Sequence, residues 1–341
     1  MKQLRIRLKE NSYNIFIEDD ILFHLSFYIK EIYQNKKIYL ITDDIVEKHY
    51  VELVKNSLKN YEIEIVVVPH GETSKSIEVY SSVIKQLLDL DIRRNELLLA
   101  LGGGVIGDLT GFVAATLYRG LPYVSIPTSL LSQMDSSIGG KTGIDFYDRK
   151  NIIGCFKQPK LVLIDPKTLH TLPKREWNNG MGELIKHAAI GNPKLFTMLK
   201  HKPEITEDII YQSLCVKQEV VEKDEFDTKE RMLLNFGHTF GHAIELKLKL
   251  KHGEAVALGM LMILQFGMDV GVTNQACYKE LKNILKQYEL PYEEPNYKDY
   301  LVEIAKDKKN LAGVIQLILL KDIGNPLFYP IKESDLKELM K

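Results

Sequence analysis

Short apolar runs alternate with amphipathic stretches through the first half of the chain. The runs span residues 37–42, 61–68, 96–101, 123–127 and 161–165. Runs of this length, bounded by turn-forming residues, are typical of strands that are buried on both faces. A stretch with helical spacing, about 76–90, separates the second run from the third. Strands that alternate with helices predict a parallel sheet with helices on both faces.

The pattern changes after Asp165 and Pro166. From Thr168 to about residue 290 the apolar positions recur at helical spacing, and one late run, 314–320, has an extended pattern. We therefore predict an α/β domain over residues 1–167 and a helical domain over residues 168–341. A length of 341 residues suits two domains. The cleft between two such domains is a natural ligand site.

Composition and charge are those of an ordinary soluble protein. Hydrophobic residues make up 45% and charged residues 27%, and the formal net charge is −1, so no global field favours nucleic acid or a membrane surface. Residues 1–9 alternate in polarity, which predicts a strand and not a signal peptide, and no apolar run reaches the roughly 18 residues of a membrane span. Three scattered cysteines indicate a reducing compartment, so we expect a cytoplasmic protein.

A glycine-rich turn follows the apolar run that ends at residue 101. Gly102, Gly104 and Gly107 satisfy the pattern G-x-G-x-x-G between a predicted strand and a helix-like stretch, 109–117. Such a turn lets the backbone approach a pyrophosphate closely at a helix N-terminus. The turn lies unusually far along the chain, and no acid ends the next strand. Because Asp43 ends an earlier strand and could hold a ribose, we predict a variant dinucleotide site.

Three histidines lie close together in the second half. His238 and His242 are four residues apart and share a face if they lie on a helix, and His252 follows soon after. Imidazole is a common ligand of zinc and similar ions. Thr239 stands where a zincin metalloprotease has Glu, which disfavours that class. Pairs of this spacing also arise by chance, so their surroundings must decide.

Two further groups of polar residues have an ordinary and a functional interpretation. Gly139 and Gly140 before Lys141 form either a plain turn or a phosphate cradle, although the spacing is not that of a Walker A motif. Glu183 and Lys186 form either a surface ion pair or part of a site in which Glu183 joins two histidines around a metal and leaves open positions.

Cations precede the histidines. Lys217 and Arg231 flank the acidic stretch 219–230, which is either a solvated helix face or the edge of a site. Arg231 lies four residues before Asn235 and seven before His238, so the three are expected near one another if the helix is continuous. Cations beside a metal suit an anionic substrate.

Together these motifs resemble the 3-dehydroquinate synthase family along nearly the whole chain, from residues 13–17 to the region 307–309. The matching motifs are 101–108, 118–120, 127–131, 135–143, 150–151, 182–183, 235–242 and 252–254. The resemblance implies a Rossmann-like NAD-binding α/β domain, an all-α metal-binding domain and a homodimer to which Arg119 is contributed across subunits. It implies conversion of 3-deoxy-D-arabino-heptulosonate 7-phosphate to 3-dehydroquinate and phosphate, in the shikimate route. NAD would oxidise the substrate transiently, phosphate would be eliminated, the hydride would return and an intramolecular aldol step would close the ring.

The resemblance also implies roles for individual positions. The expected ligands of a divalent ion, zinc or cobalt, are Glu183, His238 and His252. The positions expected at the substrate are Asp135, Lys141, Asn151, Lys186, Lys217, Arg231, Asn235 and His242, the last at its phosphate. The positions expected to contact NAD are Asp43, Glu72, Lys75, Gly103, Gly104, Val105, Asp108, Thr128, Ser129, Lys141, Lys150, Thr168 and Thr171.

Three positions depart from the family pattern. Ile45 replaces a ribose-side Asn, Asp227 replaces the usual Glu, and Lys229 stands where Gly is frequent.

Three other interpretations compete with this resemblance. A 2-deoxy-scyllo-inosose synthase acts on a substrate without a carboxylate and matches Asn235 and the Gly-Gly-Lys-Thr run less well. A glycerol-dehydrogenase-like enzyme needs no phosphate pocket, so Lys141 counts against it. A non-catalytic relative would have lost a ligand or a catalytic lysine, and all are present.

Overall fold

The computed structural model describes residues 1–147, 149–245, 247–306, 314–332 and 334–335, so the motif region 307–309 lies outside the described residues. The chain forms two compact units. Unit 1 comprises Met1–Pro173 and Ile205–Tyr211, and unit 2 comprises Lys174–Glu204 and Gln212–Lys341. The predicted boundary after residue 167 therefore differs from this division by six residues and by one short segment.

Specific contacts explain why these additional residues join unit 1. The hydroxyl of Tyr50 donates a hydrogen bond to the carbonyl oxygen of Thr168 at 3.1 Å, which ties the 3-10 turn η5 (Pro166–Thr171) to the α/β layer. Lys2 pairs with Asp208 at 2.8 Å, which ties the segment 205–211 to the N-terminal strand. Neither contact has a signature in the hydrophobic pattern.

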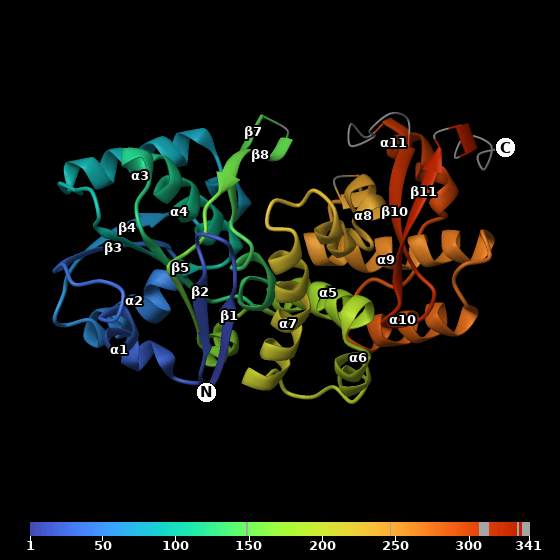
Figure 1. The fold of residues 1–341 in the computed structure, drawn as a ribbon, viewed down its shortest axis with the longest axis horizontal. Helices are drawn as coiled ribbons and strands as arrows, with labels where there is room; N and C mark the ends of the chain where they lie inside the picture. Colours follow the sequence, from blue (N-terminus) through green and yellow to red (C-terminus); the bar gives the residue numbers. More distant parts are fainter. Residues whose placement is uncertain (148, 246, 307–313, 333, 336–341) are drawn as a thin grey trace. The chain divides into compact units, whose positions relative to one another are not determined.

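The core of unit 1 is a seven-stranded sheet with the order β1-β2-β9-β6-β5-β3-β4 (Figure 1). Its strands are β1 (Lys2–Ile6), β2 (Tyr13–Ile17), β3 (Lys37–Asp43), β4 (Glu62–Val68), β5 (Leu97–Gly102), β6 (Tyr123–Pro127) and β9 (Leu161–Ile164). The pair β1–β2 is antiparallel and the other neighbours are parallel. The predicted parallel sheet is confirmed, with one antiparallel edge strand added.

Helices cover both faces of this sheet, and β5 shows why. Leu97, Leu99 and Leu101 pack on one side with η1 (Ile21–His24), α1 (Leu25–Ile29) and α2 (Val46–Ser57). Leu98 and Ala100 pack on the other side with α3 (Ile77–Asp89) and α4 (Gly104–Thr116). Alternate residues of a strand point to opposite faces of the sheet. A strand with an uninterrupted apolar run is therefore buried on both faces.

Shorter elements complete unit 1. They are η2 (Glu72–Ser74), η3 (Leu117–Arg119), the π-helical turn η4 (Ser132–Ser136), η5, and the strands β7 (Lys141–Phe146) and β8 (Arg149–Phe156). β7 and β8 form an antiparallel hairpin. Lys141, expected after a glycine turn, is therefore the first residue of a strand.

Unit 2 is helical, with one hairpin. Its elements are α5 (Lys174–Gly191), α6 (Pro193–Leu199), most of α7 (Glu207–Lys223), η6 (Glu230–Asn235), α8 (His238–Glu245), α9 (His252–Asp269), α10 (Gln275–Gln287), η7 (Tyr297–Tyr300), α11 (Leu301–Lys306), β10 (Val314–Leu320) and β11 (Pro326–Lys332). The two strands pair in antiparallel register. The late apolar run is thus a strand within an otherwise helical unit, because its residues alternate between exposed and buried at its start.

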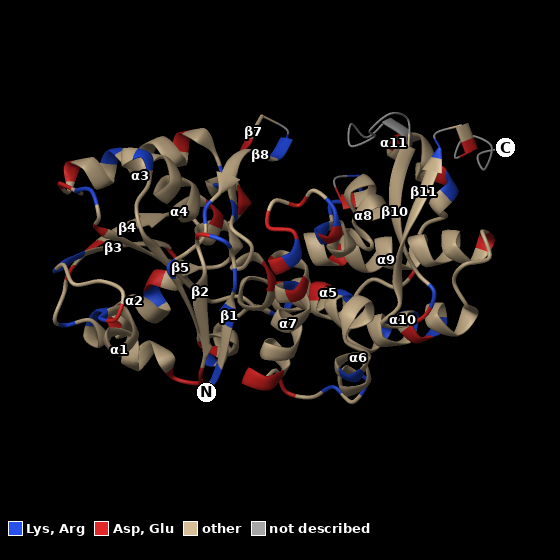
Figure 2. Ribbon diagram, in the orientation of Figure 1, with Lys and Arg blue, Asp and Glu red and all other residues tan. Residues whose placement is uncertain are grey.

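Charged residues of both signs are distributed over the helices and loops of each unit (Figure 2). The central strand β5 carries no charge, as expected for a strand covered on both sides. Among the described residues, no helix has both the length and the apolar character needed to cross a membrane.

Candidate functional site

Glycines set the distance between α5 and α9 in unit 2. A Cβ on Gly253 would lie 1.9 Å from the carbonyl oxygen of Asn179, and a Cβ on Gly182 would lie 2.3 Å from that of Gly253. Only glycine permits backbones to approach so closely. Glu183 follows Gly182 on α5, and His252 precedes Gly253 on α9. These two residues consequently lie side by side.

A second close approach brings α8 against α9 (Figure 1). A Cβ on Gly259 would lie 2.0 Å from the carbonyl oxygen of Gly237. Gly237 itself has a φ of 79°, a left-handed conformation that suits glycine, and α8 begins directly after it at His238. The turn and the crossing together direct His238 toward the residues on α5 and α9.

Glu183, His238 and His252 form a cluster with the geometry of a metal site. Their candidate ligand atoms all lie within 4.8 Å of one another. The Glu183 Oε1 atom is 3.6 Å from His238 Nε2 and 3.4 Å from His252 Nε2. Two imidazoles and one carboxylate are a donor set of catalytic zinc sites, in which a further position stays open for substrate.

The carboxylates of Glu183 and Glu245 favour a cation at the cluster. Glu183 is fully buried and pairs with the ammonium of Lys186, one turn further along α5. Burial and then the charge of Lys186 lower the pKa of His238 well below its ordinary value, which leaves the neutral imidazole that metals bind. Burial acts against a charge on His252, but hydrogen bonds to Glu183 and Glu245 raise its pKa to about 9. The same carboxylates would stabilise a divalent ion at this point.

Glu245 was not among the predicted site residues, although it contacts a predicted ligand. Its Oε2 atom lies 3.3 Å from His252 Nδ1. A carboxylate at Nδ1 holds the imidazole in the tautomer that presents Nε2 to a metal. Its only sequence signal is its place seven residues before His252. Because a turn between two helices separates the two residues, helical spacing could not predict their contact.

His242 lies beside the cluster and not within it. Its ring centroid is 5.3 Å from that of His238 and 6.1 Å from that of His252, and its side chain is exposed. The shared helical face of His238 and His242 therefore places one imidazole in the cluster and the other at its open side.

The helix from Arg231 to His238, on whose continuity the expected proximity of Arg231, Asn235 and His238 depended, is interrupted. α7 ends at Lys223, η6 is a 3-10 turn, and Gly237 breaks the chain direction before α8 begins. Arg231 is nevertheless buried, at 3% exposure, and its Nη1 donates to the carbonyl oxygen of Glu225 at 2.8 Å. Lys217 on α7 is also buried, and Asn235 ends η6 in a half-buried position.

Asp227, one of the three departures from the family pattern, has a φ of 58°. Aspartate occupies this left-handed region more readily than glutamate does, because its short side chain bonds to the local backbone. The shorter acid is thus compatible with the turn in which it stands.

In unit 1 the glycine turn joins β5 to α4 as predicted. A Cβ on Gly103 would lie 3.4 Å from the Ser129 hydroxyl, and one on Gly104 would lie 3.1 Å from the Ser136 hydroxyl. The amide of Thr128 donates to the carbonyl oxygen of Gly102 at 3.0 Å. The turn, Thr128 and Ser129 therefore gather at the carboxyl end of parallel strands, where dinucleotides bind in open α/β sheets.

A lysine-centred group adjoins this turn. The buried Lys75 ammonium lies 2.7 Å from Asp108 Oδ2 and 3.8 Å from Glu72 Oε1, and it also donates to Asn151 Oδ1. Burial opposes the charge of Lys75, but Asp108 and Glu72 outweigh it and raise the pKa of Lys75. Asn151 has a φ of 52°. Three residues expected at NAD and one expected at the substrate thus come together.

Other predicted cofactor positions have structural duties. Asp43 Oδ1 accepts hydrogen bonds from the amides of Ile45 and Val46 before α2. The Thr168 hydroxyl is buried and accepts from Gln133 Nε2 at 2.8 Å, and the Thr171 hydroxyl lies 2.5 Å from that of Tyr50. These duties hold the carboxyl edge of the sheet together.

The remaining predicted positions lie on several different elements of unit 1. Asp135 belongs to the π-helical turn η4, a conformation often found at functional sites. Lys141 and Lys150 are exposed on β7 and β8, and Val105 is in the first turn of α4. Arg119 is exposed and has a φ of 64°, a strained conformation for a residue with a side chain.

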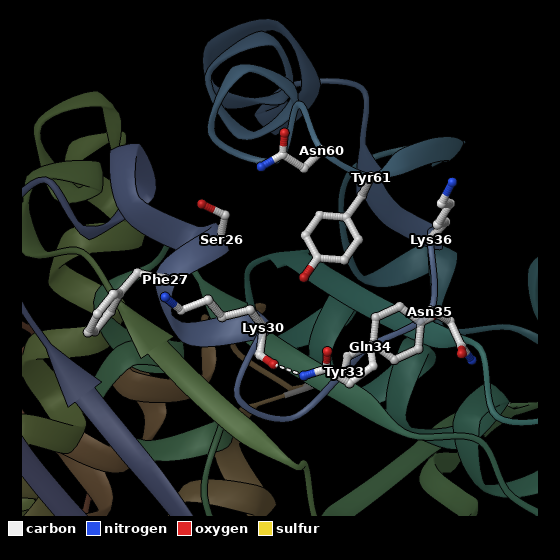
Figure 3. Close-up of a pocket in the computed structure, with 9 residues that line it drawn as sticks. All are labelled: Ser26, Phe27, Lys30, Tyr33, Gln34, Asn35, Lys36, Asn60 and Tyr61. Atoms are coloured by element: carbon white, nitrogen blue, oxygen red, sulfur yellow. Dashed lines mark hydrogen bonds between the residues drawn. The ribbon is translucent and has the colours of Figure 1, made fainter.

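Unit 1 also contains a pocket that is lined by none of the predicted site residues (Figure 3). It is lined by Ser26, Phe27, Lys30, Tyr33, Gln34, Asn35, Lys36, Asn60 and Tyr61. These residues belong to α1 and to the segments that lead into β3 and β4. They therefore mark the amino ends of those strands, opposite the edge at which α/β sheets bind ligands.

The fold is shared with two synthases that were solved with NAD+ and a divalent metal. The 2-epi-5-epi-valiolone synthase of Streptomyces hygroscopicus subsp. jinggangensis 5008, solved with NAD+ and Zn2+, is 26% identical, with a TM-score of 0.87 over 98% of this chain and 97% of that chain. A 2-deoxy-scyllo-inosose synthase is 22% identical, with a TM-score of 0.87 over 99% of each chain. The two-unit fold, the glycine turn and the cluster of Glu183, His238 and His252 thus place this chain in a class of NAD- and metal-binding synthases.

Sequence comparison narrows the class. Residues 65–179 match the model of the 3-dehydroquinate synthase N-terminal domain, and residues 180–310 match that of the C-terminal domain. The 3-dehydroquinate synthase of Clostridium botulinum (strain Alaska E43 / Type E3) is 44% identical over 95% of this chain and 96% of its own. The chain belongs to the 3-dehydroquinate synthase family.

Proposed function

We propose that this protein catalyses the 3-dehydroquinate synthase reaction, the conversion of 3-deoxy-D-arabino-heptulosonate 7-phosphate to 3-dehydroquinate and phosphate. The elimination of phosphate makes it a carbon–oxygen lyase. The observation that carries the proposal is the cluster of Glu183, His238 and His252, placed by glycine contacts in a chain 44% identical to a 3-dehydroquinate synthase. The 22% identity to a 2-deoxy-scyllo-inosose synthase makes that cyclase the second candidate.

The three clustered side chains would hold a divalent ion, zinc or cobalt. When bound, the ion supplies a Lewis acid for a substrate oxygen, and NAD supplies an acceptor and donor of hydride. The chain prepares this point with a neutral His238 and with Glu245 behind His252. Lys186 balances the buried carboxylate of Glu183 and offers a cation to the substrate hydroxyls beside it.

The substrate is an anion at both ends, and the cations of unit 2 suit it. Arg231 and Lys217 are buried, so each is fixed in position and poorly screened by water. The exposed His242 imidazole can donate a hydrogen bond to the phosphate that leaves. Holding a flexible anion in one geometry supplies much of the rate in such a reaction.

NAD would lie at the β5–α4 turn. The first amides of α4 favour a pyrophosphate, and Gly103 and Gly104 let it approach the backbone. Lys75, held by Asp108, presents a cation at the same edge of the sheet. Asn151, which bonds to Lys75, would link the cofactor residues to those that contact the substrate.

We also propose that the protein is a homodimer in the cytoplasm. The strained backbone of Arg119 supports a role for its exposed side chain in a partner subunit's site, since strain of this kind is retained where the surroundings or the function require it. The three cysteines, all within the described residues, form no disulfide, which accords with a reducing compartment.

The assignment is tested with purified protein, a divalent metal and substoichiometric NAD. We expect phosphate release from the heptulosonate phosphate, formation of dehydroquinate and no net accumulation of NADH. Metal-replete protein that releases no phosphate would refute the proposal. Cyclisation of a sugar phosphate without a carboxylate would support the second candidate, and steady NADH production from a plain polyol would indicate a dehydrogenase.

A further inference from the structure

Residues 224–229 connect the end of α7 to η6, in which Arg231 is buried. This segment contains no helix or strand, and Asp227 within it has a left-handed φ of 58°. Backbone amides in such a segment need hydrogen-bond acceptors, because unpaired buried amides are costly. One side chain, at the start of the segment, supplies them.

That side chain is the carboxylate of Asp224, which accepts three hydrogen bonds from the segment and one from Arg231 in η6. Its Oδ1 accepts from the amide of Thr228 at 3.0 Å and from the Thr228 hydroxyl at 3.1 Å. Its Oδ2 accepts from the amide of Lys229 at 2.7 Å and from that of Arg231 at 3.2 Å. Both oxygens are thus committed to the turn that precedes η6.

Asp224 is itself fixed. It is buried, at 7% exposure, and its amide donates to the carbonyl oxygen of Val220 at 3.0 Å, which makes it a continuation of α7. Burial disfavours its charge, but the amides of Thr228, Lys229 and Arg231 outweigh that effect and lower the pKa of Asp224. The Asp224 carboxylate, held at the end of α7, therefore accepts a hydrogen bond from the backbone amide of Arg231.

We propose that Asp224 is a positioning residue, which holds residues 225–231 in the one conformation that presents Arg231 to an anionic substrate. Arg231 is restrained twice by this segment, at its amide by Asp224 and at its guanidinium by the carbonyl oxygen of Glu225. Two restraints on one residue fix both its place and its direction. The part of the inference that concerns substrate rests on the proposed function, whereas the restraint on the segment does not.

Two variants separate the contributions of the carboxylate. Asp224→Ala removes all four acceptor bonds, whereas Asp224→Asn keeps one oxygen and turns an amide group toward backbone donors. Glu219→Gln is the matched control, because Glu219 is an exposed acid on the same helix and its ion pair is with Lys223. Asparagine has nearly the same size as aspartate. If the restraint on the segment decreases from wild type to Asp224→Asn and further to Asp224→Ala, hydrogen bonding and not side-chain volume accounts for the first decrease.

Hydrogen exchange measures the restraint without any activity. We expect the amides of Thr228, Lys229 and Arg231 to lose at least about tenfold in protection in Asp224→Ala, while α9 and the Glu219→Gln protein are unchanged. Unchanged protection at these three amides would overturn the inference. The result stands whether or not the wild type releases phosphate, so failure of the proposed function is recognised separately.

A double-mutant cycle tests whether Asp224 acts through Arg231. We expect kcat/KM for the heptulosonate phosphate to fall about tenfold or more in Asp224→Ala, mainly through KM, and to fall less than about twofold further when Asp224→Ala is added to Arg231→Gln. An equal fall in both backgrounds would show that Asp224 acts elsewhere and would overturn its positioning role.

Discussion

The three residues of the metal cluster differ in what surrounds them, and this decides their properties. Glu183 is fully buried beside Lys186, His238 is held neutral by burial, and His252 is backed by Glu245. His242 shares a helix face with His238 but lies exposed at the open side. Chemically identical imidazoles therefore have different surroundings, and we expect different roles for them.

Substitution of the two types of histidine should have different effects on metal and on activity. We expect His252→Ala to weaken metal binding by at least about a hundredfold, since even residues behind a ligand contribute 10–100-fold. His242→Ala should keep the metal and lose activity. Metal content after gel filtration, with phosphate release measured in parallel, gives both values. Full metal content in His252→Ala would contradict its assignment as a ligand.

Asp224 should make folding stability depend on pH in acid. Its pKa is lowered in the folded protein, so the folded state favours the carboxylate. The stabilisation is complete above the ordinary carboxyl pKa and is lost as pH falls through the lowered value. We expect the difference in unfolding free energy between wild type and Asp224→Ala to be constant near neutrality and to shrink below about pH 4. Denaturant unfolding at a series of pH values measures it, and a difference that grows in acid would contradict the sign.

Elements meet in unit 2 where glycines allow it. Gly182 and Gly253 bring α5 and α9 into backbone contact, and Gly237 and Gly259 do the same for α8 and α9. Each of the three proposed ligands is adjacent to one of these glycines in the chain. The positions of these side chains thus depend on helix crossings as much as on their own residue types.

A methyl group at one crossing should separate two ligands. We expect Gly253→Ala to lower the unfolding free energy by about 1–3 kcal/mol and to weaken metal binding, because its Cβ would lie 1.9 Å from the Asn179 carbonyl oxygen. Gly107→Ala is the control, since a Cβ there meets nothing within 4 Å. Thermal unfolding and metal titration test this pair. Equal metal affinity in both variants would show that the crossing is not needed.

The whole chain consists of two units with different ligands assigned to them. The seven-stranded sheet and the glycine turn belong to unit 1, whereas all three metal-cluster residues belong to unit 2. A ligand that binds only the folded state stabilises the part that it contacts. The two proposed cofactors should therefore have separate effects on stability.

Metal should stabilise unit 2 in particular. Free zinc or cobalt at about a hundred times its Kd should add about 2.7 kcal/mol to unfolding, and a chelator should remove this gain. Hydrogen exchange should localise the added protection to α5, α8 and α9, whereas NAD should protect β5 and α4. Equal stabilisation of His252→Ala by metal would indicate binding at another place.

The sequence by itself determined five strands of the central sheet of unit 1 and the glycine turn after β5. Each apolar run from 37–42 to 161–165 became a strand, and the glycine turn lies between β5 and α4, because strand burial and turn conformation are local properties. The family motifs likewise single out Glu183, His238 and His252, which the structure brings together.

Tertiary structure alone decided how distant residues meet. The break between Arg231 and His238, the contact of Glu245 with His252 and the four bonds of Asp224 depend on turns and helix crossings that no periodicity encodes. The domain division likewise depends on contacts of Tyr50 and Lys2. Hydrophobic spacing reports which face of an element is buried, but the partner on that face is chosen by the packing of the whole unit.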